Sequence, residues 1–160
     1  MQIIRPATPQ DADACVGIVE GLSDFFSADV PERVRLDLAR FQAWVLADAG
    51  EVVAFTVASR RSSRAAEIAW AAVAASRRAR GMGTALVCHV LSALHDDGVQ
   101  VVEVKTLDSS ADYGPYRATC LFWEKCGFVQ VDTIDPLPGW QPGNPSAIYV
   151  AALALTRPPS

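Results

Sequence analysis

Between a predicted strand and a predicted helix the chain reads Val73-Ala74-Ala75-Ser76-Arg77-Arg78-Ala79-Arg80-Gly81-Met82-Gly83-Thr84. Gly81 and Gly83 have no side chain, so the backbone can approach a ligand closely at both positions. The first N–H groups of the following helix lack partners within the helix and carry partial positive charge. The stretch therefore predicts an anion site suited to phosphate groups. Three arginines add positive charge at the same place: Arg77, Arg78 and Arg80.

Two better-known phosphate motifs do not fit this stretch. The Walker pattern needs Gly-Lys followed by Ser or Thr, which is missing after Gly83. The dinucleotide fingerprint needs a third Gly or Ala, and Leu86 stands in that place. Taken alone, the stretch can also be a glycine-rich turn with solvated arginines.

Hydrophobic periodicity and capping residues predict the elements on both sides of this stretch. Their order is strand, helix, helix, three strands, helix, strand, helix and two strands. That order predicts an α/β or α+β fold with a mixed sheet. Strands are predicted at Gln2–Ala7, Ala43–Asp48, Glu51–Ser59, Ala66–Ala74, Val101–Leu107, Phe128–Ile134 and Ala147–Leu155. Helices are predicted from the N-cap Thr8 to about Leu22, from Pro31 to Arg40, and at Gly81–Asp97 and Pro115–Cys126.

Length and composition narrow the class of protein. The 160 residues suit a single domain over residues 1–155, followed by a frayed tail at residues 156–160. With 51% hydrophobic and 20% charged residues the chain is an ordinary globular sequence, and its net charge of −4 argues against a general nucleic-acid binder. We find no apolar run long enough to span a membrane and no signal peptide. We therefore expect a cytoplasmic protein with no membrane partner.

Cysteine and histidine usage argues against several site types. The four cysteines form no C-x-x-C pair, so a disulfide framework is not expected. His89 and His95 match no metal-ligand spacing, and we expect no metal. A Ser/His/Asp hydrolase would also need a G-x-S-x-G motif, which the chain lacks.

Three motifs of the chain resemble those of the GNAT N-acetyltransferases. Arg78-x-x-Gly81-x-Gly83 is similar to the Q/R-x-x-G-x-G/A loop with which that family binds the pyrophosphate of acetyl-CoA. Ala66–Val73 resembles the family's fourth strand, and Glu51–Phe55 resembles its central hairpin. Phe122-Trp123-Glu124-Lys125-Cys126-Gly127-Phe128 resembles its F/L-Y-E-K-x-G-F signature. Because the matches run in family order over nearly the whole chain, it is identified as a member.

The resemblance implies a central mixed, mostly antiparallel and splayed sheet of about seven strands, flanked by about four helices. It implies acetyl-CoA as co-substrate, with the pantetheine arm entering between strands four and five beside the backbone of Ala71, Ala72 and Val73. The alanines of the fourth strand leave room for it, although close packing against a helix explains them equally well. The pyrophosphate would meet the residues of the loop: Arg78, Ala79, Arg80, Gly81, Met82, Gly83 and Thr84.

Amine acylation needs a base, because an unperturbed lysine-like ammonium has a pKa of about 10.4. Glu67 is the one acid of strand 66–74. It stands in an A-E-I stretch similar to the one in which a branch of the family carries its general base. We therefore expect Glu67 to act as general base, with partial burial favouring its protonated form. A charge at the strand edge with no role is the alternative.

The family's general acid is the tyrosine of F/L-Y-E, where this chain has Trp123. An indole N–H donates a hydrogen bond but no proton near neutral pH. Tyr116 lies two helical turns upstream, roughly 10 Å along the axis, and is a second candidate. A third alternative is that no acid is needed, because a thiol of pKa ~8.5 is already a fair leaving group.

We expect an acetyl-CoA-dependent N-acetyltransferase that acts on a small-molecule or peptide amine, with a homodimer as the family-level expectation. The first alternative is a GNAT-fold module that binds acyl-CoA as a sensor or partner with little catalysis. The second is an unrelated phosphate-binding domain. Acceptor residues are expected in Asp24–Arg35 and Asp135–Pro145, which carry exposed-looking Phe25 and Phe26 together with Asp29, Glu32, Trp140 and Gln141.

Overall fold

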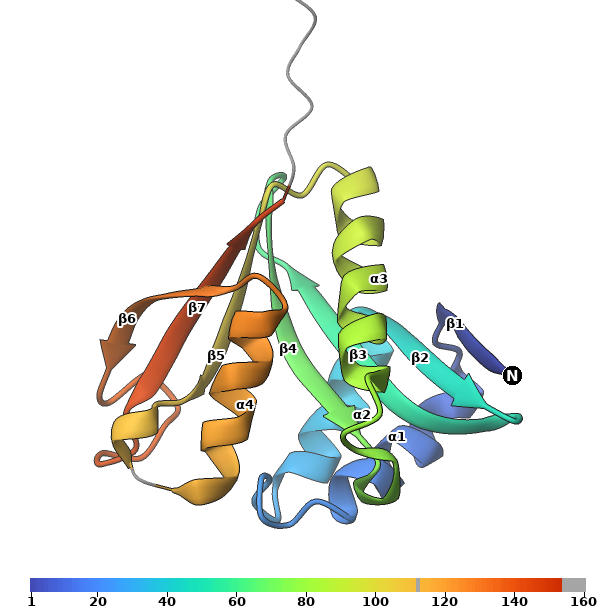
Figure 1. Ribbon diagram of the computed structural model, residues 1–160, viewed down its shortest axis with the longest axis horizontal. Helices are drawn as coiled ribbons and strands as arrows, with labels where there is room; N and C mark the ends of the chain where they lie inside the picture. The colour runs from blue at the N-terminus through green and yellow to red at the C-terminus, as the bar shows by residue number, and fades with distance from the viewer. Residues whose placement is uncertain (112, 154–160) are drawn as a thin grey trace, which may run out of the picture. The chain divides into compact units, whose positions relative to one another are not determined.

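The computed structural model describes residues 1–111 and 113–153. Seven strands form one sheet in the order β1-β2-β3-β4-β5-β7-β6, and four α-helices accompany it (Figure 1). The strands are β1 (Gln2–Pro6), β2 (Gln42–Asp48), β3 (Glu51–Arg60), β4 (Ala65–Val73), β5 (Val101–Leu107), β6 (Val129–Ile134) and β7 (Ser146–Ala152). The α-helices are α1 (Ala12–Glu20), α2 (Val30–Arg40), α3 (Met82–Asp96) and α4 (Gly114–Lys125).

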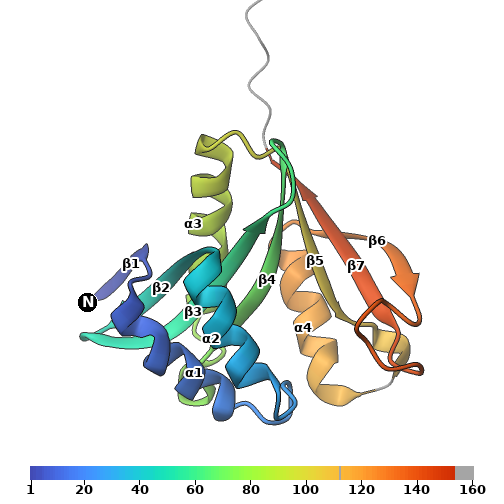
Figure 2. The same cartoon turned by 180° about the vertical axis from the view of Figure 1, so that it is seen from behind.

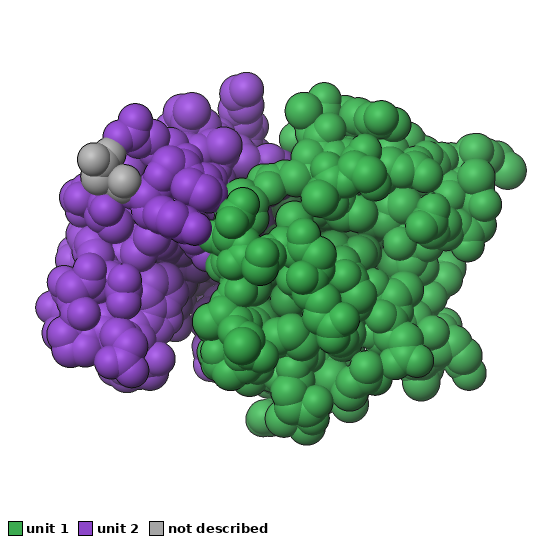
Figure 3. All heavy atoms as spheres, turned by 90° about the horizontal axis from the view of Figure 1, so that it is seen from below, with its two compact units in different colours: residues 1–59, 68–90 green, residues 60–67, 91–160 purple. Residues whose placement is uncertain are grey.

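The chain divides into two compact units, which Figure 3 colours separately. Unit 1 comprises Met1–Ser59 and Ile68–Val90, and unit 2 comprises Arg60–Glu67 and Leu91–Ser160. The expectation of a single domain over residues 1–155 stays a prediction. In the described part of the chain no helix is long and apolar enough to cross a membrane, and the cytoplasmic location also stays a prediction.

In unit 1, strands β1, β2 and β3 pair antiparallel. The β2–β3 turn has positive φ at Ala49 (52°) and Gly50 (84°), as a tight hairpin with right-twisted strands requires. Helices α1 and α2 cover one face of these strands and the start of α3 covers the other (Figures 1 and 2). The apolar stripes of α1 and α2 meet the strands in a buried cluster: Cys15, Ile18, Val19, Leu22, Val30, Val34, Val45, Phe55, Val57 and Ala72.

In unit 2, β7 lies between β5 and β6 and pairs antiparallel with both. Every second residue of β5 is buried, as period-two alternation of a half-covered strand requires. Helix α4 packs on β5 and buries Cys120 and Trp123. This arrangement fixes which α4 side chains point into the unit 2 core.

The predicted fold class is confirmed as α+β, with the predicted order of elements. The predicted N-cap Thr8 and the proline after it are confirmed, but the first turn, Pro9–Asp11, is a short 3-10 turn, η1, and α1 begins at Ala12. The Asp11 carboxylate accepts the Thr8 N–H at 2.7 Å and closes this turn as a capping box. The last strand ends at Ala152, whereas it was predicted to reach Leu155; residues 154–160, including the predicted tail, lie outside the described residues.

Candidate functional site

The glycine loop between β4 and α3 lies in unit 1. After β4 the chain forms a short turn, η2 (Ala75–Arg77), and then adopts left-handed backbone at Ala79 (φ 60°) and Gly81 (φ 76°). The Gly81 carbonyl accepts the first backbone bond of α3, from Ala85 N–H at 3.0 Å. Residues 78–81 are exposed, and α3 then runs for 15 residues. An exposed loop therefore leads into the N-terminus of a long helix, as an anion site requires.

The three arginines of the loop do not act together. Arg77 forms ion pairs with Asp48 and, at 3.5 Å, with Glu51, so its charge is paired with carboxylates at the β2–β3 turn. Arg78 lies over the ring of Phe25, 4.4 Å from its centroid. Arg78 and Arg80 are exposed, and they are the arginines of the loop available to an anion.

The predicted pantetheine strand segment is the end of β4, also in unit 1. Ala72 is buried in the α1–α2 core, whereas Ala71 and Val73 are half-buried. Beyond the strand, Ala74 N–H donates to Val53 O at 2.8 Å and holds the chain against β3. The small side chains of β4 thus serve close packing on the core side, which was one of the two explanations left open for the alanines.

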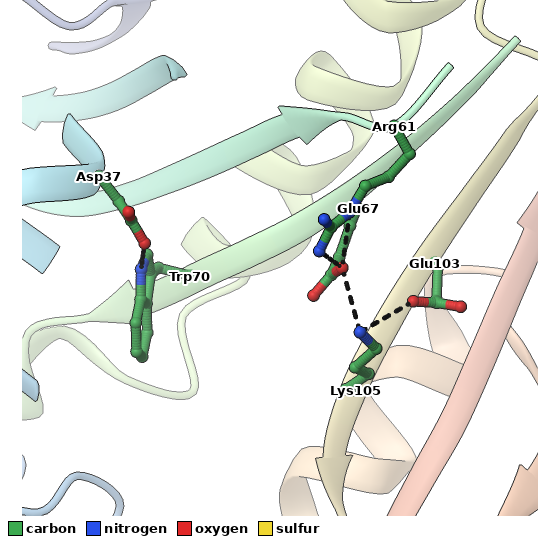
Figure 4. Close-up of polar contacts among 6 residues, drawn as sticks. All are labelled: Asp37, Arg61, Glu67, Trp70, Glu103 and Lys105. Atoms are coloured by element: carbon green, nitrogen blue, oxygen red, sulfur yellow. Dashed lines mark hydrogen bonds and ion pairs between the residues drawn. The ribbon is translucent and has the colours of Figure 1, made fainter. Parts of the chain in front are cut away.

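An aromatic and charged cluster beside this segment was missed by sequence reasoning. The indole N–H of Trp70 donates to Asp37 at 2.7 Å (Figure 4), and Arg33 lies 5.3 Å from the ring centroid. Phe26 approaches the same ring edge-on at 6.3 Å. Phe25 and Phe26 pack partly buried against the core, so the expectation that they are exposed is wrong. The i, i+4 spacing of Arg33 and Asp37 on α2 is the one sequence signal that pointed to a shared face.

A hollow of about 650 Å³ opens between α1 and α2 in unit 1. Its lining includes Phe26, two carboxylates and one guanidinium, from Glu20, Glu32 and Arg35. Arg35 is paired with Asp13 at 2.9 Å, so its charge is already balanced. The hollow overlaps the predicted acceptor segment Asp24–Arg35. The other predicted segment, 135–145, belongs to unit 2, with Trp140 half-buried and Gln141 exposed.

Glu67 is buried, with 8% of its surface exposed, and belongs to unit 2. Its Oε2 accepts hydrogen bonds from Arg61, including one from Nε at 3.1 Å, and from Lys105 Nζ at 3.3 Å. Lys105 Nζ also lies 3.4 Å from Glu103 (Figure 4). Two cations therefore lie against one oxygen of the Glu67 carboxylate, so this buried charge is paired.

Tyr116 and Trp123 both lie on α4 in unit 2. Tyr116 is half-buried beside Tyr113, with ring centroids 5.9 Å apart, and burial raises the pKa of its hydroxyl. Trp123 is 5% exposed and packs edge-on against Phe122 and Phe128 at 5.0 and 5.2 Å. The environment of Trp123 is that of a core residue.

A buried tyrosine hydroxyl in unit 2 was not foreseen. Tyr149 is 1% exposed and donates to Glu124 at 3.1 Å, and burial raises the pKa of its hydroxyl. Cys120 donates to Leu107 O at 3.5 Å, and burial likewise raises the pKa of its thiol. Tyr149 and Glu124 are 25 positions apart, so no local pattern in the sequence connects them.

Comparisons with known proteins agree with this geometry. The model of the family described as "Acetyltransferase (GNAT) domain" matches residues 39–130, which is more than half of the chain. That range contains β4, the glycine loop, Glu67 and Trp123. Among curated proteins the sequence has no significant match.

Solved structures share the fold over the whole length. A GNAT-family protein from Desulfovibrio desulfuricans has a TM-score of 0.85 at 19% identity, over 96% of this chain and 100% of that one. The ribosomal-protein-S18-alanine N-acetyltransferase from Escherichia coli gives 0.78 at 19% identity, over 98% and 97%. An aminoglycoside 6'-N-acetyltransferase complexed with coenzyme A gives 0.75 at 19% identity, over 98% and 99%. At such identities the likeness establishes the fold alone.

Proposed function

Because the chain belongs to the GNAT family of acetyltransferases, we propose that it transfers the acetyl group of acetyl-CoA to an amine by direct attack, with Glu67 as general base. The observation that carries the proposal is the glycine loop. Left-handed backbone at Ala79 and Gly81 and the exposed loop that leads into α3 suit a phosphate-bearing co-substrate. The residues of the loop fit that group.

Acetyl-CoA would be held by this chain at two segments of unit 1. The backbone of Arg78–Thr84 would bind the pyrophosphate, and Arg78 and Arg80 would add charge-assisted contacts. The backbone of Ala71–Val73 would pair with the pantetheine amides, in a gap that the family resemblance predicts. When bound, the co-substrate supplies an activated acetyl thioester.

Glu67 would take the proton that the acceptor's ammonium group must lose before attack. Its burial supports this role, because a carboxylate that is shielded from water is not simply a solvated surface charge. Arg61 and Lys105 both donate to its Oε2, so Oε1 is the oxygen that would take the proton. We therefore propose Glu67 as a base whose carboxylate is already paired with Arg61 and Lys105.

We propose that the departing thiolate leaves without a dedicated acid. Trp123 has no acidic proton near neutral pH and is enclosed by Phe122 and Phe128, which favours a packing role. Tyr116 is the alternative acid: it is half-buried, and burial holds its hydroxyl protonated. The thiol pKa of ~8.5 is low enough for unassisted departure.

The acceptor is proposed to be a small-molecule or peptide amine. The hollow between α1 and α2 carries two carboxylates that can attract a cation, and Phe26 adds an apolar wall. Relatives of the same fold act on a ribosomal protein and on aminoglycosides by their names, so the fold serves amines of very different size. A homodimer stays a prediction that light scattering can check.

A second function is favoured by one observation. The tyrosine of the family signature is replaced by Trp123, which is a core residue here. A GNAT-fold module that binds acyl-CoA as a sensor, with little catalysis, would tolerate that replacement. Binding of acetyl-CoA without transfer to any amine would support this alternative.

The test of the proposed function is Glu67→Gln, which keeps the shape of the side chain and removes the base. Thiol release from acetyl-CoA with an amine acceptor should fall by ~10²–10⁴, with acetyl-CoA affinity nearly unchanged. The loss should shrink at high pH, where free amine is already present. Wild-type turnover in the variant at neutral pH would assign Glu67 a structural role.

A further inference from the structure

Around Glu67, four charges of unit 2 alternate in sign (Figure 4): Arg61, Glu67, Lys105 and Glu103. Arg61 comes from the turn after β3, Glu67 from β4, and the other two residues from β5. The Lys105 Nζ is 3.3 Å from Glu67 Oε2 and 3.4 Å from Glu103 Oε1. One ammonium group is thus shared almost equally by two carboxylates.

Exposure distinguishes the members of this cluster. The side chains of Glu67 and Lys105 are 11% and 28% exposed, so their attraction is weakly screened by solvent. Arg61 is 56% exposed and Glu103 is 38% exposed. Solvent therefore weakens the influence of Arg61 on Glu67, although Arg61 donates two hydrogen bonds to the same oxygen. Lys105 is the less exposed of the two cations and the one that Glu103 shares.

We propose that Lys105 is a positioning residue for the reaction, which holds the Glu67 carboxylate charged and oriented, and that Glu103 moderates this hold by sharing the same ammonium. The inference rests on the proposed role of Glu67. When Glu67 takes a proton from the acceptor's ammonium, its charge becomes zero and its attraction for Lys105 falls. Lys105 then keeps Glu103 as a partner, so the cluster is not left with an unpaired cation. The proton passes from Glu67 to water and the pair re-forms.

The proposal makes opposite predictions for two variants in the pH profile of kcat/KM at saturating acetyl-CoA. Lys105→Met removes a cation beside Glu67, so protonation becomes easier and the acid limb moves to higher pH. Glu103→Gln leaves Lys105 to Glu67 alone and removes a repelling charge, so the acid limb moves to lower pH. Lys105→Arg should stay close to the wild type. Lys125→Met, at an exposed lysine in the last turn of α4, is the control and should not move the limb.

A merely structural role would lower the melting temperature without moving the acid limb in opposite directions. If Glu67→Gln abolishes the limb while Lys105→Met and Glu103→Gln leave it in place, the positioning role is wrong and the base assignment stands. If the wild type transfers no acetyl group, the proposed function fails instead. In either case, the ¹³C resonance of the Glu67 carboxyl follows its titration without any acetyl transfer. Midpoints that shift in opposite directions in Lys105→Met and Glu103→Gln support the shared ammonium, and unchanged midpoints overturn it.

Discussion

Trp123 is the residue at which this chain departs from its family signature, and its contacts indicate why the change is tolerated. The indole projects from α4 and packs edge-on against Phe128 in the unit 2 core. Trp123→Phe should change the acetyl-transfer rate by less than tenfold, because the phenyl ring keeps most of that packing. Trp123→Ala should cost about 3–5 kcal/mol of unfolding free energy. Urea melts and thiol-release rates measure both, and a loss beyond a hundredfold in a stably folded Trp123→Phe would assign the indole a direct role.

Tyr116 and a restored tyrosine distinguish the two acid schemes. If the thiolate leaves unassisted, Tyr116→Phe should be near neutral, and Trp123→Tyr should raise the rate by up to ~10² if its hydroxyl reaches the sulfur. If Tyr116 is the acid, Tyr116→Phe is the damaging change and Trp123→Tyr gains little. Steady-state rates of the two variants, measured side by side, decide between the schemes.

Asp11 is the residue for which the structure predicts a pH-dependent stability. The Arg5 guanidinium donates to both of its oxygens, at 2.8 and 2.9 Å, and holds the pKa of the carboxyl well below its usual 3.8. A pKa that is lower in the folded state gives stability that is complete above about pH 4 and lost as the pH falls further. Asp11→Asn should cost about 1.5 kcal/mol at pH 7, and the cost should shrink below pH 4. Urea melts between pH 3 and 7 check this, and a constant difference would contradict it.

At the scale of elements, the glycine loop carries the strongest prediction. Gly83→Asp and Gly81→Asp should abolish acetyl-CoA binding through bulk and like charge, and Gly81→Asp is also penalised by its φ of 76°. Arg78→Ala should weaken binding by about 1–2 kcal/mol. Arg77→Ala is the matched control, because Arg77 is occupied by Asp48, and it should leave affinity within twofold. Calorimetric titration measures all four, and unchanged affinity in a folded Gly83→Asp would remove the loop from the site.

Elements set by local pattern were predicted well, and contacts between distant residues were not. Strand β5 has the predicted bounds, because β-branched alternation is a local signal. The first helical turn was predicted as part of an α-helix, but it is a 3-10 turn, and the ion pair of its Asp11 with Arg5 on β1 was not foreseen. The contact between Trp70 and Asp37 joins residues 33 positions apart, which no single-sequence period detects. Hence the loop could be predicted from the sequence, whereas the partners of Glu67 and Trp70 could not.

At the scale of the whole molecule, the order of strands and helices was enough to predict the fold class. The family match adds the class of activity, that of an acetyltransferase. The seven-stranded order and four helices agree with relatives that share only about a fifth of the sequence. The predicted cofactor residues gather in unit 1, and Glu67, Tyr116 and Trp123 belong to unit 2. Changes in one set should therefore affect acetyl-CoA affinity, and changes in the other should affect the rate.

Acetyl transfer itself is the measurement that tests the account most directly. Wild-type protein, acetyl-CoA and a panel of amines, peptides and aminoglycosides are incubated, and mass spectrometry follows the 42-dalton gain expected of one acetyl group. The account predicts acetylation of at least one amine, strongly reduced with Glu67→Gln and absent with Gly83→Asp. Binding of acetyl-CoA with no acetylated product from any amine would contradict it and make the chain an acyl-CoA sensor.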